Sequence, residues 1–225
     1  LVYNLSAGEP MVTVHPLVVQ AVEQALAQGK THYPPVAGLP ELRSAAVHWL
    51  AQTYGAHYDA GECLVTCGGK FGLYAACQAL LNPGDEVVIL APYWVSYPAM
   101  AQIFGGVPKI VNTQESNGWK ASLADIAAAL TPRTKLLILN NAANPTGALY
   151  AKEELQAILT LCVEQDVMVL SDEVYSGLVY DQNQFISCGV FPEFKNNLVL
   201  VQSCSKHFAM TGWRVGFVLA PLELI

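Results

Sequence analysis

The sequence contains few charged residues and no basic cluster. Only 13% of its 225 residues are charged, and 18 acidic side chains outnumber 11 basic ones, which gives a net charge of −7. A phosphate backbone would be repelled by most of such a surface, because nucleic-acid binding needs concentrated Lys and Arg. The composition therefore argues against a nucleic-acid partner and favours small-molecule ligands.

Long apolar runs are also missing, although 53% of the residues are hydrophobic. A membrane-spanning helix needs roughly 18–20 consecutive apolar residues, and no run approaches this length, so we expect no contact with a membrane. The simplest expectation is a globular domain with one large core. The excess of apolar residues further predicts buried strands and a face buried between two subunits.

The six cysteines lack the spacing of a metal site or of a disulfide framework, since no CxxC pair occurs. We expect buried, reduced thiols. The N-terminus has no basic stretch before an apolar one, as a signal or transit peptide would have. The sequence also lacks an initial Met and stops soon after an apolar run, so we expect it to be a piece of a longer protein.

Helical and strand-like patterns alternate along the chain. Residues 15–29 have Pro at the first turn, apolar residues on one face and a final Gly, and residues 39–55 repeat this plan. The pattern predicts an α/β domain with a mainly parallel seven-stranded sheet that helices bury on both faces. The predicted strands are 63–66, 86–90, 107–111, 135–139, 167–170, 198–202 and 214–220.

Ligands of such sheets bind at the carboxyl ends of the strands. The segments that follow five predicted strands are CGGKFG, APYWVSY, NNAANPTG, SDEVY and SCSK. Each has a simpler explanation alone: the Gly pair as a tight turn, Trp94 as a core residue, NPTG as the turn before a helix, Asp172 as a cap, and Lys206 and Arg214 as surface charges.

Considered together, the five segments fit one cofactor. A Gly turn before a helix, an aromatic ring, an amide, an acid, a lysine and an arginine would hold a flat, phosphorylated aldehyde. Pyridoxal 5′-phosphate has these features: an aldehyde that reacts with an amine of lowered pKa, a ring nitrogen that a carboxylate keeps protonated, and a phosphate that Arg and backbone N–H groups bind. The sequence therefore predicts a pyridoxal-phosphate site.

Seven motifs occur in one order over essentially the whole chain: SAGEP, HYPPVAG, GGK, PYWVSYP, NPTG, SDEVY and SxSKxxxMTGWRxG. This series resembles the class I aminotransferases of fold type I, and most of all the aspartate aminotransferases of the bacterial subgroup. The resemblance implies the large domain of that fold, with residues 1–25 leading into it and residues 26–225 forming the cofactor-binding domain. It also implies a homodimer with shared active sites and a cytoplasmic location.

The resemblance gives roles to individual residues. Lys206 would hold the cofactor as a Schiff base and then act as general base and acid. Asp172 would pair with the ring nitrogen, Tyr175 and Asn144 would bond the phenolic oxygen, and Trp94 would stack on the ring. Lys206, Asp172 and Tyr175 are thus the implied catalytic residues.

The remaining implied contacts involve the phosphate and the substrates, an amino acid and a 2-oxo acid. The phosphate would be bound by Gly69, Lys70, Ser203, Ser205 and Arg214, with Tyr33 reaching it from the neighbouring subunit. Gly8, Trp94 and Asn144 would contact the substrate, Gly8 at its α-carboxylate. Lys70 would face a distal carboxylate, which predicts aspartate as donor and 2-oxoglutarate as acceptor; the alternative is that Lys70 only caps the turn.

The sequence departs from the family in two motifs and in extent. It has GGKFGL where the family usually has GGKQAL, and NNAANPTG where the family often has NSPxNPTG. Family members continue into a small C-terminal domain, absent here, whose arginine binds the α-carboxylate.

Three function classes remain open. The chain is the cofactor-binding portion of an active aminotransferase, a cofactor-binding fragment with little or no transamination, or a fold relative such as a carbon–sulfur lyase, a decarboxylase or a ligand-binding regulator. A nicotinamide-binding fold is disfavoured, because no GxGxxG follows the first strand.

Overall fold

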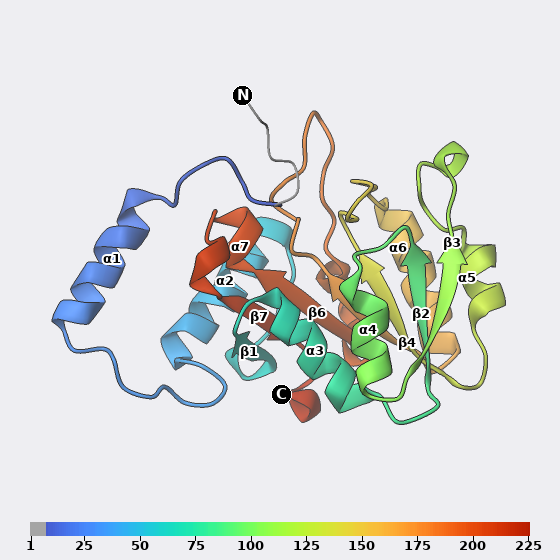
Figure 1. Cartoon of the computed structure of the whole chain (residues 1–225), viewed down its shortest axis with the longest axis horizontal. Helices are drawn as coiled ribbons and strands as arrows, with labels where there is room; N and C mark the ends of the chain where they lie inside the picture. The colour runs from blue at the N-terminus through green and yellow to red at the C-terminus, as the bar shows by residue number, and fades with distance from the viewer. Residues whose placement is uncertain (1–7) are drawn as a thin grey trace.

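The computed structural model describes residues 8–225 and contains one seven-stranded sheet in the order β1-β7-β6-β5-β4-β2-β3 (Figure 1). Neighbouring strands from β6 through β5, β4 and β2 to β3 are parallel, whereas β7 is antiparallel to both β6 and β1. The mainly parallel sheet that the sequence predicts is thus confirmed. The strands are β1 (Cys63–Thr66), β2 (Glu86–Ala91), β3 (Val107–Asn112), β4 (Thr134–Asn140), β5 (Met168–Asp172), β6 (Leu198–Ser203) and β7 (Gly216–Leu219).

Helices cover both faces of the sheet because successive strand residues point to opposite sides. Leu137 and Leu139 of β4 pack with α6, while Leu136 and Ile138 pack on the side of α3 and α4, which cross in front of the strands in Figure 1. The helices are α1 (Pro16–Ala27), α2 (Pro40–Tyr54), α3 (Gly69–Leu80), α4 (Ser96–Ile103), α5 (Leu123–Ala129), α6 (Lys152–Glu164) and α7 (Cys204–His207).

Helix α1 forms where the sequence predicts it, but the described chain does not cover its apolar side. None of its residues is buried, and Leu17 and Leu26 are largely exposed. Figure 1 shows α1 (blue) separated from the sheet by a connecting segment. Within residues 8–225, its apolar residues therefore add little to the core.

The structure differs from two expectations. The strand predicted for 214–220 begins only at Gly216, because Arg214 has the left-handed backbone conformation (φ 56°), which cannot continue a strand. The expectation of buried thiols is wrong for Cys67, which is exposed, and correct for the other five free cysteines. Of the predicted N-terminal segment 1–25, and of the SAGEP motif within it, residues 1–7 lie outside the described residues.

No helix in the described residues has the length and apolarity needed to cross a membrane.

Candidate active site

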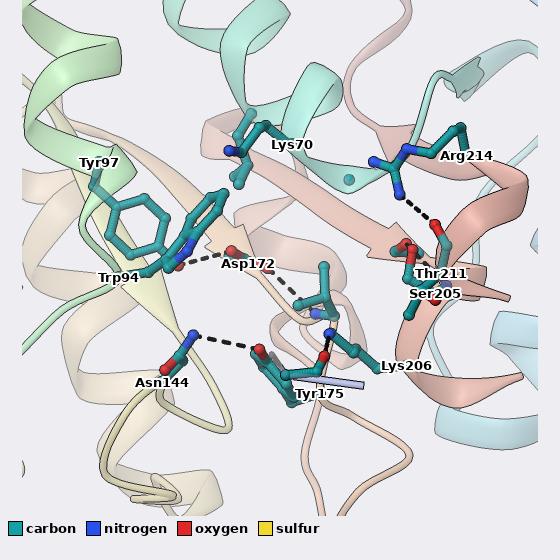
Figure 2. A pocket seen from close by; sticks show the side chains of 15 residues that line it. Lys70, Trp94, Tyr97, Asn144, Asp172, Tyr175, Ser205, Lys206, Thr211 and Arg214 are labelled. Carbon is teal, nitrogen blue, oxygen red and sulfur yellow. Dashed lines mark hydrogen bonds between the residues drawn. The ribbon is translucent and has the colours of Figure 1, made fainter. Parts of the chain in front are cut away.

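A cavity of about 570 Å³ opens at the carboxyl ends of the central strands (Figure 2). Every residue that the sequence analysis named for the site lines this cavity, apart from Tyr33. Four lining residues were not predicted: Leu73, Tyr97, Val174 and Thr211. Residues that are far apart in the sequence are thus brought to one edge of the sheet.

One wall of the cavity combines a helix N-terminus with an arginine. Helix α3 begins at Gly69, so its free backbone N–H groups and positive dipole end lie at this wall. Gly68, with φ 80°, precedes it, and a Cβ at this position would overlap the Arg214 guanidinium. Arg214 Nη1 donates to the Thr211 carbonyl at 2.6 Å, and no ion pair among residues 8–225 involves Arg214.

Two serine hydroxyls extend this wall. Ser203, the last residue of β6, caps α7, because its Oγ accepts a hydrogen bond from the Ser205 N–H at 3.1 Å. The Ser203 hydroxyl also lies 2.9 Å from the Ser205 Oγ. Together with Arg214 and the start of α3, these hydroxyls form a set of donors suited to a phosphate.

A buried carboxylate lies deeper in the cavity. Asp172, the last residue of β5, is only 3% exposed and accepts hydrogen bonds from the Tyr97 hydroxyl at 2.7 Å and from the Val174 N–H at 3.2 Å. Burial raises the Asp172 pKa to about 6, although both hydrogen bonds act in the opposite direction. A cation beside this carboxylate would favour its ionised form, so the position suits a protonated ring nitrogen.

Lys206 projects from α7 toward Tyr175 (Figure 2). Its Nζ donates to the Gly8 carbonyl and lies 5.8 Å from the centre of the Tyr175 ring. The Lys206 pKa is lowered, mainly by burial and further by Arg214, while Glu9 opposes the shift. A lowered pKa increases the neutral, nucleophilic fraction of the amine.

Polar and aromatic groups complete the opposite side. Asn144 Nδ2 donates to the Tyr175 hydroxyl at 3.3 Å. Trp94 packs edge-on against Tyr97, with ring centres 5.6 Å apart. The Lys70 Nζ lies 4.7 Å from the centre of the Trp94 ring, close enough for a cation–π interaction. This side therefore offers an aromatic surface with an ammonium group beside it.

Tyr33 is fully exposed and does not line the cavity. The role implied for it requires a neighbouring subunit, so that role stays a prediction. The residues within the described chain nevertheless fit pyridoxal 5′-phosphate. They provide an amine, a buried carboxylate, a flat ring and a cluster of phosphate donors around one cavity.

The fold and this arrangement of groups are those of a large family of enzymes. The family model "Aminotransferase class I and II" matches residues 2–225, and the chain belongs to this family. Members of the family use pyridoxal 5′-phosphate, which is therefore the cofactor of the site.

Two curated relatives show which members of the family the chain is similar to. The chain is 45% identical over 221 residues to an aspartate/prephenate aminotransferase of Thermus thermophilus, and 39% identical over 225 residues to an aspartate aminotransferase of Geobacillus stearothermophilus. These alignments cover 98% and 100% of the chain, but the chain spans only 57% of the length of each relative.

The chain is also similar in structure to solved aminotransferases. The structure of the Thermus thermophilus aspartate aminotransferase with maleate has a TM-score of 0.94 at 44% identity and matches 98% of this chain and 57% of that one. An aromatic aminotransferase of Pyrococcus horikoshii has a TM-score of 0.95 at 36% identity, covering 98% and 59%. The large-domain architecture of fold type I that the sequence predicts is thus confirmed.

Proposed function

We propose that the protein is the cofactor-binding part of an aminotransferase that moves an amino group between an amino acid, preferably aspartate, and 2-oxoglutarate. The observation that carries the proposal is that Lys206, Asp172 and Arg214 line one cavity at the carboxyl edge of the sheet. These three groups match the aldehyde, ring nitrogen and phosphate of the cofactor. A cytoplasmic location is part of the proposal and rests on the family resemblance alone.

Each group in the cavity has a defined task toward the cofactor. When bound, pyridoxal phosphate supplies an electron sink for negative charge that forms at the substrate Cα. Asp172 would keep the ring nitrogen protonated, and Trp94 would stack on the ring. Arg214, the N–H groups at the start of α3 and the Ser203 and Ser205 hydroxyls, which all lie at the cavity, would bind the phosphate.

Lys206 would hold the cofactor through a Schiff base and would also move the proton during transfer. Its lowered pKa leaves more of the amine neutral near neutral pH, which suits both tasks. The Nζ would accept the proton that leaves the substrate Cα as a general base, and would later release it as a general acid. Tyr175 and Asn144, joined by a hydrogen bond, would bind the phenolic oxygen.

The preference for aspartate rests on Lys70 and on the relatives. Lys70 lines the cavity beside Trp94, where its ammonium group would meet the distal carboxylate of a dicarboxylic substrate. One relative was solved with maleate, a four-carbon dicarboxylate, and others are named aspartate or aspartate/prephenate aminotransferases. The backbone of Gly8 would bind the α-carboxylate.

A homodimer with shared active sites is part of the proposal. Most apolar residues of α1 and the adjoining Tyr33 and Val36 are exposed in the single chain, as residues at a subunit interface would be. In a dimer, Tyr33 would reach the phosphate of the neighbouring subunit.

Titration with pyridoxal phosphate, followed by borohydride reduction and peptide mass mapping, tests the cofactor site. A visible band that shifts with pH and an adduct on Lys206 are expected, and an adduct elsewhere would overturn the assignment. Amino transfer from aspartate to 2-oxoglutarate tests the reaction. Release of ammonia, pyruvate or carbon dioxide instead would favour a lyase or a decarboxylase, and an adduct without turnover would favour a binding fragment.

A further inference from the structure

The Tyr54 hydroxyl joins two segments that carry site residues. Tyr54 ends α2, and its hydroxyl lies 2.9 Å from the Ser176 Oγ and 3.3 Å from the His207 Nδ1. Ser176 directly follows Tyr175, and His207 directly follows Lys206. Tyr54, Ser176 and His207 do not line the cavity, so they connect the two cavity-facing residues from outside it.

The connection continues into the core as a chain of hydrogen bonds. The Ser176 hydroxyl donates to the Gln202 Oε1 at 3.3 Å, and the Gln202 Nε2 donates to the Glu173 Oε2 at 3.3 Å. Gln202 and Glu173 are completely buried. The other carboxylate oxygen of Glu173 accepts from the Ser171 hydroxyl and from the Cys188 N–H. The chain therefore ends on a fully hydrogen-bonded carboxylate.

With Glu173 ionised, the proton count along this chain sets the protonated nitrogen of the histidine. A hydroxyl has one proton to donate. Because Ser176 gives its proton to Gln202, the Tyr54 proton goes to Ser176. The Tyr54 oxygen can then only accept from His207, so the Nδ1 of His207 carries a proton in this arrangement.

Packing also fixes the ring of His207. Its centre lies 5.0 Å from that of Trp49 and 4.5 Å from that of Phe208, with both neighbours at steep angles to it. Gly177 lies against the other side, where a Cβ would overlap the Nδ1. The position of the ring thus depends on a glycine that leaves room for it and on aromatic neighbours that confine it.

We propose that His207 is a positioning residue for Lys206, which it orients through the hydrogen bond from its Nδ1–H to Tyr54. Helix α7 has only four residues, and a helix this short does not hold its own orientation. Ser203 caps its first turn, and His207 anchors its last residue to α2 and to the segment of Tyr175. The proposal rests on the role proposed for Lys206 toward the cofactor.

The test compares His207→Phe, Tyr54→Phe and His207→Asn. Phenylalanine keeps a ring but no donor, whereas the amide nitrogen of Asn falls near the position of Nδ1. Tyr150→Phe is the control, because Tyr150 is a buried tyrosine whose hydroxyl accepts a hydrogen bond from the Ala121 N–H at 3.0 Å, among the residues packed against α6. All four proteins are checked for folding by thermal unfolding.

Two readouts do not require turnover. The rate of acylation of Lys206 in the cofactor-free protein, followed by peptide mass mapping, should change by on the order of tenfold in His207→Phe and Tyr54→Phe, since small displacements of reacting groups have large effects on rates. The acylation rate should stay within about twofold of the wild-type rate in His207→Asn and Tyr150→Phe. In the wild-type protein, ¹⁵N NMR should show His207 protonated on Nδ1.

Protonation on Nε2 alone would overturn the proposal, as would wild-type acylation rates in both His207→Phe and Tyr54→Phe. The pH titration of the visible band in the cofactor-loaded proteins is an independent test. The midpoint of this titration should shift in His207→Phe and Tyr54→Phe. If the wild-type protein forms no adduct at Lys206, the proposed function fails. The NMR and acylation results would still decide whether His207 orients the lysine.

Discussion

The Tyr97 hydroxyl donates a 2.7 Å hydrogen bond to the buried Asp172 carboxylate. Tyr97 belongs to α4 and is itself buried, so the bond joins two well-packed elements and fixes the direction of the carboxylate. Burial raises the Tyr97 pKa, as does the nearby Asp172, so the phenol remains a proton donor throughout the physiological range.

Replacing Tyr97 by Phe should raise the pKa of Asp172 above about 6, because the carboxylate loses the donor that most favours its ionised form. A hydrogen bond to a charged group contributes about 1.5–3 kcal/mol, so the affinity for pyridoxal phosphate should fall at least roughly tenfold. Equilibrium titration at pH 7 measures the affinity, and ¹³C NMR measures the pKa. An unchanged pKa would show that the bond does not stabilise the carboxylate.

Arg214→Ala should weaken the binding of pyridoxal phosphate by on the order of 10–100-fold, because it removes charge-assisted hydrogen bonds to the phosphate. Arg133→Ala is the control, since Arg133 pairs with Glu86 next to the amino end of β4, at the other edge of the sheet. Competition of inorganic phosphate with pyridoxal phosphate measures the affinity of the site for phosphate directly. Equal losses in the two variants would contradict the assignment of Arg214 to the phosphate.

Gly68→Ala should impair the same site in two ways. Ala at φ 80° and ψ 165° lies in a region used almost only by Gly and is strained by about 1–3 kcal/mol, and its Cβ would displace the Arg214 guanidinium. Gly84→Ala is a matched control, because Gly84 has φ 92° but open space where the Cβ would lie. Both variants should lose stability in urea, and only Gly68→Ala should lose affinity for the cofactor.

Lys70→Ala should reduce kcat/KM for aspartate by on the order of 10²-fold, because the distal carboxylate loses its ionic partner, and should reduce it far less for an apolar amino acid. Steady-state kinetics with the two amino donors measures the difference. Equal losses with both substrates would leave Lys70 as a capping residue of the turn without a part in specificity.

The buried Glu173 makes stability dependent on pH. Burial raises its pKa to about 7 from an ordinary 4.5, so the folded protein binds this proton more tightly than the unfolded chain does. The stability linked to Glu173 is therefore full below pH ~4.5 and is lost as pH rises through ~7, by about 3 kcal/mol in total. Urea unfolding of the cofactor-free protein between pH 5 and 9 should show this loss, and Glu173→Gln should reduce it. An identical pH dependence in both proteins would contradict the raised pKa.

The sequence predicted the strands and most of the site because the signals are local. Apolar runs such as KLLIL end at turn residues, and the residues just after them meet at one sheet edge. The reversed direction of β7 was not predictable in this way, because an apolar run has no direction. The left-handed backbone conformation of Arg214 was likewise not predictable from the apolar run.

Tyr97 and His207, which sequence reasoning missed, act through partners that are distant in the sequence. Tyr97 lies within a recognised motif, but its bond to Asp172 joins residues 75 positions apart in the sequence. The contact between Tyr54 and His207 joins residues 153 positions apart. Such pairs arise only when tertiary packing brings helices and loops together.

The reversal of β7 places the two groups proposed for opposite ends of the cofactor in one loop. Ser203, at the end of β6, pairs directly with Gly216, at the start of β7, so residues 204–215 form a loop whose two ends meet in the sheet. Lys206 and Arg214 both belong to this loop. The length of this loop therefore limits how far apart the amine and the guanidinium can lie, and these are the groups proposed for the aldehyde and the phosphate of the cofactor.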